Sequence, residues 1–139
     1  MRFTFIQQGE ALAREWPRLN ALFEALPLSE RSEYTLDQLR VMAESGRAQV
    51  AKIEGDAGGL LMALALEHID YPAYSAVNIL AMAGDRPGRA AWQFGLEAIK
   101  EFARRTDATA VQALCGDGIA RLLARHGFEK TYNQVRISL

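Results

Sequence analysis

The spacing of apolar residues changes several times along the chain, and each change predicts a new element. Residues 2–7 alternate, with Phe3 and Phe5 on one side, which is the period of a half-buried strand. Residues 10–26 instead repeat apolar side chains every three or four positions, which forms one stripe on a helix. Pro17 lies inside this second run and predicts a kinked helix or two short helical pieces.

The middle of the chain predicts a helix followed by three strands. After a polar loop at 29–33, Thr35 and Gln38 have the spacing of a capping box, and Gly46 provides a stop. These signals predict a helix over 35–44. Strands are expected at 49–53, 60–69 and 76–83, with a tight glycine turn at 55–58.

The last third adds a long helix at 87–105, a strand at 109–115 and a short helix that Gly127 ends. Val135, Ile137 and Leu139 then alternate with polar residues and predict a final strand. The element order is therefore β-α-α-β-β-β-α-β-α-β. Length and this order predict an α/β protein, more narrowly α+β, with a single domain over 1–139.

Composition narrows the functional classes. The 139 residues carry a formal net charge of -1, which disfavours a nucleic-acid-binding module. One cysteine excludes an intrachain disulfide and suits a reducing compartment, and two histidines make a zinc site improbable. Neither a membrane-spanning run nor a signal peptide is recognisable, so we expect a cytoplasmic location, or a particle assembled there.

The most informative segment runs from the strand at 76–83 into the helix at 87–105. A strand that stops in a glycine turn and opens a helix leaves free backbone N–H groups at the positive end of the helix dipole. Phosphate groups commonly bind there, so this segment predicts a phosphorylated ligand. The structural alternative is that Asp85 merely caps the helix and that Pro87 occupies its first turn.

Two motifs in this order resemble the GNAT superfamily of acyl-CoA-dependent N-acyltransferases. Residues 85–90, Asp-Arg-Pro-Gly-Arg-Ala, stand where that family has its pyrophosphate loop, Gln/Arg-x-x-Gly-x-Gly/Ala. Residues 120–128 resemble the closing helix of the family, with Leu122, Gly127 and Phe128 at matching positions. The departures are Asp85, in place of Gln or Arg, and Leu123, in place of the tyrosine that protonates the departing thiolate.

The resemblance is strongest to phage-encoded GNAT-like proteins, in which a phenylalanine-bearing first strand and a Trp-Pro-Arg segment recur and the pyrophosphate loop is often eroded. Here these features are residues 3–6 and 16–18. The resemblance implies a mixed, mostly antiparallel sheet flanked by helices. It also implies that the strands at 76–83 and 109–115 splay apart.

The resemblance further implies acetyl-CoA as cosubstrate and a small-molecule or protein amine as acceptor. The pantetheine arm would pair with backbone near Leu80 to Met82, and amides around Gly88 would hold the pyrophosphate. The residues expected to bind the cosubstrate are Leu80, Ala81, Met82, Arg86, Gly88, Arg89, Ala90 and Ala91.

An attacking amine must lose a proton, so a base is expected near the acceptor. Glu67 and His68 end a strand and are the candidate bases, and Tyr132 is the nearest substitute for the missing tyrosine. Each also has a structural alternative: a solvated edge carboxylate, a polar strand-end residue and a packed aromatic ring, respectively.

Two functions therefore remain open. The first is a small N-acyltransferase; the second is a GNAT-like fold without chemistry that acts as a binding or virion-associated protein. The second would use apolar surface around Tyr71 and Tyr74 for contact. A homodimer is compatible with either function.

Overall fold

A computed structural model describes residues 1–29 and 31–139. In this part of the chain, five strands form one sheet in the order β1-β2-β3-β4-β5. Neighbouring strands are antiparallel except for β4 and β5, which are parallel. The elements are β1 (Arg2–Phe5), α1 (Glu10–Phe23), α2 (Leu36–Glu44), β2 (Gln49–Glu54), β3 (Leu60–Asp70), β4 (Ser75–Gly84), α3 (Gly88–Arg105), β5 (Ala110–Gln112) and α4 (Asp117–Ala124).

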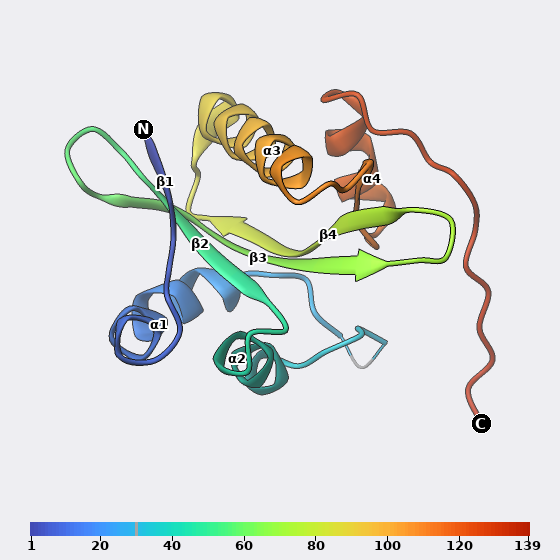
Figure 1. The fold of residues 1–139 in the computed structure, drawn as a ribbon, viewed down its shortest axis with the longest axis horizontal. Helices are drawn as coiled ribbons and strands as arrows, with labels where there is room; N and C mark the ends of the chain where they lie inside the picture. The colour runs from blue at the N-terminus through green and yellow to red at the C-terminus, as the bar shows by residue number, and fades with distance from the viewer. Residues whose placement is uncertain (30) are drawn as a thin grey trace.

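The helices cover the two faces of the sheet, with α1 and α2 on one face and α3 and α4 on the other (Figure 1). Strand alternation explains this division. On β3, Leu64 and Leu66 join the core beneath α3, whereas Ala63 and Ala65 face α1 and α2. The small alanines leave room for the large side chains of α1, where the Trp16 ring contacts that of Phe23. The predicted α/β class with a mostly antiparallel sheet is confirmed.

Local signals in the first half of the chain are confirmed closely. Thr35 and Gln38 form both hydrogen bonds of the capping box, and Gly46 has φ +81° just after α2. Pro17 does not split α1, which continues through it. The loop predicted at 29–33 includes residue 30, which lies outside the described residues.

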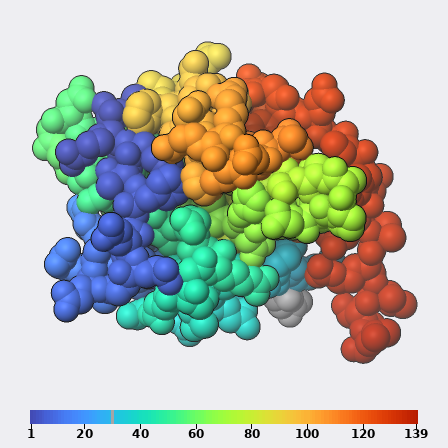
Figure 2. Space-filling view, in the orientation of Figure 1, coloured from blue at the N-terminus to red at the C-terminus, as the bar shows by residue number. Residues whose placement is uncertain are grey.

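The C-terminal segment differs from the prediction. Residues 125–139 contain neither helix nor strand, so the strand expected at 135–139 is wrong for this structure. Val135 and Ile137 are 91% and 83% exposed. Figure 2 shows this segment, in red, along the surface beside the β3–β4 hairpin. Alternation specifies which side chains share a face, but a strand also needs a paired neighbour. The strand expected at 109–115 is likewise reduced to the three residues of β5.

None of the helices in residues 1–29 and 31–139 combines the length and apolarity that crossing a bilayer requires.

The end of β4 is packed too closely for a side chain, which gives a stability prediction. A Cβ atom on Gly84 would lie 2.6 Å from the carbonyl oxygen of Leu61, a backbone atom that cannot move away freely. We expect Gly84→Ala to lower the free energy of unfolding by about 1–3 kcal/mol. Urea unfolding followed by circular dichroism measures this change.

Gly118→Ala is the matched control. Gly118 lies in α4, and nothing lies within 4 Å of its Cβ position. Alanine should leave stability unchanged or raise it by up to about 1 kcal/mol, since alanine favours helix. Equal destabilisation by both substitutions would contradict the packing of β4 described above.

Candidate functional site

The parallel strands β4 and β5 pair over a short distance only. Their partners are Ala76 with Ala110, Val77 with Val111, and Asn78 with Gln112. β5 ends at Gln112, whereas β4 continues to Gly84. In the described part of the chain, β4 beyond Asn78 is therefore paired with β3 alone. Its other edge presents backbone N–H and C=O groups to a gap.

A bulge interrupts β4 at the beginning of this gap. Ala65 of β3 opposes Ala81, but the next residue, Leu66, opposes Ile79, so Leu80 has no partner on β3. An extra residue of this kind bends a strand and redirects its backbone groups. The bulge therefore turns β4 where it leaves β5.

The segment between α1 and α2 is attached to this bulge. The Tyr34 hydroxyl donates a hydrogen bond to the carbonyl oxygen of Leu80. Burial, and secondarily the nearby Glu33 carboxylate, raise the pKa of Tyr34 to about 12. The phenol is therefore neutral and remains a donor over the whole physiological range.

At its far end β4 enters the N-terminus of α3. The chain turns through Arg86 and Gly88, with φ of 50° and 82°, into a helix of 18 residues. Pro87 is the N-cap and no side chain caps the helix, so the interpretation of Asp85 as a cap is wrong. Nothing lies within 4 Å of the Cβ position of Gly88, and residues 88–90 are exposed.

The first amides of α3 are thus uncovered and lie at the positive end of its dipole. The exposed Arg86 and Arg89 add two positive charges in the same turn, and Asp85 adds one negative charge. The local balance favours an anion, although less than it would without the carboxylate.

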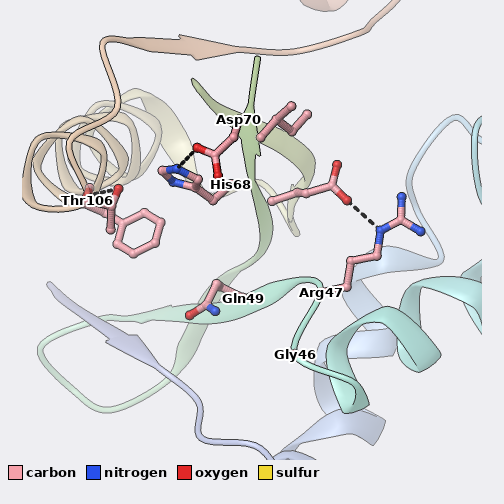
Figure 3. A pocket seen from close by; sticks show the side chains of 9 residues that line it. Gly46, Arg47, Gln49, His68, Asp70 and Thr106 are labelled. Atoms are coloured by element: carbon pink, nitrogen blue, oxygen red, sulfur yellow. Dashed lines mark hydrogen bonds and ion pairs between the residues drawn. The ribbon is translucent and has the colours of Figure 1, made fainter. Parts of the chain in front are cut away.

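The candidate bases lie elsewhere on the sheet. Glu67 accepts a hydrogen bond from Arg47 Nε at 2.9 Å, and His68 Nε2 lies 3.1 Å from Asp70 Oδ1. Both residues line a hollow of about 720 Å³ at the end of β3, together with Phe102 and Thr106 (Figure 3). The Ser75 hydroxyl, and then His68, hold the pKa of Asp70 below its usual value.

The hollow lies at the end of β3 next to β2, whereas the gap lies at the far edge of β4. In the β3–β4 pairing, Glu67 faces Asn78 and His68 faces Val77, so both backbones adjoin the last residues that join β4 to β5. Tyr132 is 81% exposed in the C-terminal segment and does not line the hollow. The structure therefore places Glu67 and His68 beside the same hollow, each with its own partner, and leaves Tyr132 apart. The catalytic roles of all three stay predictions.

Several solved structures with the same architecture are acetyltransferases. A probable acetyltransferase superposes with TM-score 0.73 and 15% identity, covering 100% of this chain and 97% of its own. A GNAT family acetyltransferase from Staphylococcus aureus gives 0.71 at 12% identity over both whole chains. An aminoglycoside 6'-N-acetyltransferase from Acinetobacter haemolyticus gives 0.69 at 17%, covering 100% and 98%. No protein-family model and no curated sequence matches the chain.

The chain has the GNAT fold. In this fold the diverging strands are β4 and β5, and the segment compared with the pyrophosphate loop is the turn into α3. Pairing between these strands stops at Gln112, as the expected splay requires.

Two residues near α4 stand at positions where a proton donor or a nucleophile could be sought. Leu123, at the position of the family tyrosine, is 5% exposed and packs in the core beneath α3 and α4. Cys115 is an exposed residue with a free thiol. Partial desolvation of the sulfur, and to a smaller extent the Asp117 carboxylate, raise the pKa of Cys115, so the group stays a protonated thiol.

Sequence reasoning missed a polar group at the point where β4 and β5 part. Asn78 and Gln112 are parallel neighbours, and Gln112 Nε2 donates to the Tyr71 hydroxyl at 2.9 Å. The rings of Tyr71 and Tyr74 pack against each other in a tilted arrangement, with centroids 5.1 Å apart. The available signal was an asparagine inside the otherwise apolar run of β4.

The Tyr34 hydrogen bond predicts a measurable loss on removal of its hydroxyl. We expect Tyr34→Phe to lower the free energy of unfolding by about 0.5–1.5 kcal/mol, because the carbonyl of Leu80 loses its side-chain donor. Urea unfolding at neutral pH measures this difference between the variant and the wild type.

The raised pKa of Tyr34 also predicts a pH dependence. Below the unfolded-state value of 10.0 both states hold the proton, and between 10.0 and about 12 the unfolded state loses it first. This contribution to wild-type stability is therefore present below pH 10 and is lost as the pH rises toward 12. The gap in stability between the wild type and Tyr34→Phe should shrink from pH 8 to pH 11. A constant gap would contradict the buried position of the phenol.

Proposed function

We propose that this protein is an acyl-CoA-dependent N-acyltransferase, with acetyl-CoA as donor and an amine as acceptor. The observation that carries the proposal is the uncovered N-terminus of α3, placed directly after the unpaired part of β4. One element offers an anion site and the other offers free backbone groups along an extended path. A diphosphate joined to an amide-bearing arm has the chemistry to use both.

The diphosphate would lie on the first amides of α3. Gly88, Arg89, Ala90 and Ala91 provide N–H groups, and the side chains of Arg86 and Arg89 provide charge. Gly88 fits this role because its φ of 82° suits glycine and because no other atom occupies the space before it.

The pantetheine arm would lie along the open edge of β4. An extended ligand with amide groups can pair with a free strand edge as another strand would. Leu80, Ala81 and Met82 line this edge beside the bulge. A backbone N–H of the bulge is the candidate group to polarise the thioester carbonyl.

The transfer step needs a nucleophile and a route for its proton. The amine nitrogen forms a bond to the thioester carbon, the C–S bond breaks, and the thiolate takes up a proton as it leaves. The amine gives up one proton, for which Glu67 and His68 are the candidate acceptors through solvent in the hollow. Holding both reactants in place can supply several kcal/mol of the barrier.

The acceptor is best sought first among amino sugars. Two of the structural neighbours are aminoglycoside acetyltransferases, one of them in complex with sisomicin. Sisomicin and related aminoglycosides are therefore the first acceptors to assay, with thiol release as the readout.

One set of observations favours the second candidate, a GNAT fold that binds partners without chemistry. Asp85 places a carboxylate in the pyrophosphate turn, and Leu123 fills the position of the tyrosine with a buried side chain. The exposed Tyr71 and Tyr74 would then form the contact surface. Failure to bind any acyl-CoA would select this candidate.

The charge balance at the turn into α3 predicts how donor affinity can be changed. We expect acetyl-CoA to raise the melting temperature of the wild type, with about 2.7 kcal/mol of added stability at a hundredfold excess over Kd. We expect Asp85→Arg to tighten binding roughly tenfold, because it replaces a repelled charge by an attracted one. Isothermal titration calorimetry measures both affinities.

Glu101→Arg is the matched control, since it makes the same change in net charge near the other end of α3. It should leave the affinity within about threefold. Acetyl-pantetheine, which lacks the phosphates, should bind far more weakly than acetyl-CoA. No melting shift at millimolar acetyl-CoA, or equal affinity for both thioesters, would reject the proposed donor site.

A further inference from the structure

Asn78 carries an unpaired polar atom in the middle of the molecule. It is the last residue of β4 that is paired with β5, and it is 8% exposed. Its Oδ1 atom is buried and has no hydrogen-bond partner among the described residues. A buried carbonyl oxygen without a donor costs stability, so its presence calls for an explanation.

The direction of Asn78 follows from its neighbours on β4. Val77 and Ile79 belong to the core beneath α3, so alternation turns Asn78 to the face covered by α1 and α2. Its pairing partner on β3, Glu67, forms a salt bridge with Arg47, which lies between α2 and β2. Asn78 therefore lies on the side of the sheet opposite to α3.

Three hydrogen bonds involve residues close to Asn78 in the sheet or its bulge, and none of them reaches Asn78 Oδ1. Arg47 Nε donates to Glu67, Gln112 Nε2 donates to the Tyr71 hydroxyl, and the Tyr34 hydroxyl donates to the carbonyl of Leu80. Glu67 and Gln112 are the pairing neighbours of Asn78 on β3 and β5, and Leu80 lies two residues further along β4. A bound molecule with an N–H group can supply the missing donor.

We propose that Asn78 Oδ1 accepts a hydrogen bond from the attacking amine of the acceptor. This inference rests on the proposed acyltransferase function. The diphosphate site lies at the start of α3, which packs on the opposite face. The molecule that reaches Asn78 from the α1 and α2 side is therefore the acceptor rather than the nucleotide end of the donor.

The chemistry of this contact selects the form of the amine. A neutral oxygen accepts one N–H and leaves the nitrogen lone pair free to point into the gap between β4 and β5. The only carboxylate adjacent in the pairing, Glu67, is already paired with Arg47. Burying an ammonium ion beside a carboxylate that is already paired costs desolvation energy, so the site favours amines that bind uncharged, which is the reactive form.

Because this oxygen is unpaired in the described part of the free protein, a substitution that removes it should weaken acceptor binding without lowering the stability of the fold. Asn78→Leu keeps a similar volume and removes the unpaired atom. It should retain or raise the melting temperature, while the acceptor loses its hydrogen bond. A residue with a purely structural role would show the opposite pattern, with stability lost.

The test uses acetyl-CoA and hydroxylamine, a small amine that is uncharged at neutral pH. Thiol release is followed, with the reaction in the absence of protein subtracted. We expect Asn78→Leu to raise KM for hydroxylamine about three- to tenfold, as loss of one neutral hydrogen bond predicts. The Kd for acetyl-CoA from calorimetry should stay within twofold.

Two further variants make the test specific. Asn78→Asp keeps an oxygen acceptor in the same volume, so its KM should lie closer to that of the wild type than the KM of Asn78→Leu. It also serves if the leucine variant does not fold. Asn133→Leu makes the same chemical change in the exposed C-terminal segment and should alter neither constant.

The outcomes distinguish this inference from the proposed function. If the wild type does not bind acetyl-CoA, the proposed function fails, and the inference fails with it. If the wild type binds acetyl-CoA, three results overturn the inference alone. The wild type gives no hydroxylamine-dependent thiol release, Asn78→Leu leaves KM unchanged, or Asn78→Leu instead weakens acetyl-CoA binding tenfold.

Discussion

The parallel pairing of β4 with β5 stops after three residue pairs, and the rest of the site follows from that limit. Because β5 ends at Gln112, β4 passes its last six residues with a free edge. The bulge at Leu80 bends β4 away from its neighbour, and Tyr34 holds the bulge from the α1 and α2 side. Full pairing to Gly84 would close the gap and leave no path to the N-terminus of α3.

Among the residues that the structure describes, three backbone or side-chain groups near the candidate site lack the hydrogen-bond partners that such groups usually have in folded proteins. A strand edge is unpaired, the first turn of an 18-residue helix has no side-chain cap, and one buried carbonyl oxygen has no donor. Each costs stability, and each lies along one line from α3 to the point where β4 and β5 part. Such local conflicts concentrate where a protein binds ligands, since the two substrates of a transfer reaction can satisfy these groups between them.

The parts of this structure that could be predicted from sequence depend on local chemistry. Thr35 and Gln38 specify their capping box within four residues, and Gly88 and its neighbours mark the turn into α3. The strand expected at 135–139 failed because pairing depends on a distant partner that alternation does not identify. Asn78 was missed because only the three-dimensional arrangement of the described residues shows that its Oδ1 is buried without a hydrogen-bond partner.

The central claim is that the open edge of β4 and the start of α3 form one binding surface for an acyl-CoA. The most direct measurement is a two-dimensional ¹⁵N NMR titration of the protein with acetyl-CoA. The account predicts that the amides of Gly88, Arg89 and Ala90 shift together with those of Leu80 to Met82, while the amides of β1 stay unchanged. Shifts confined to the hollow around Arg47 and His68, or no shifts at all, would contradict it.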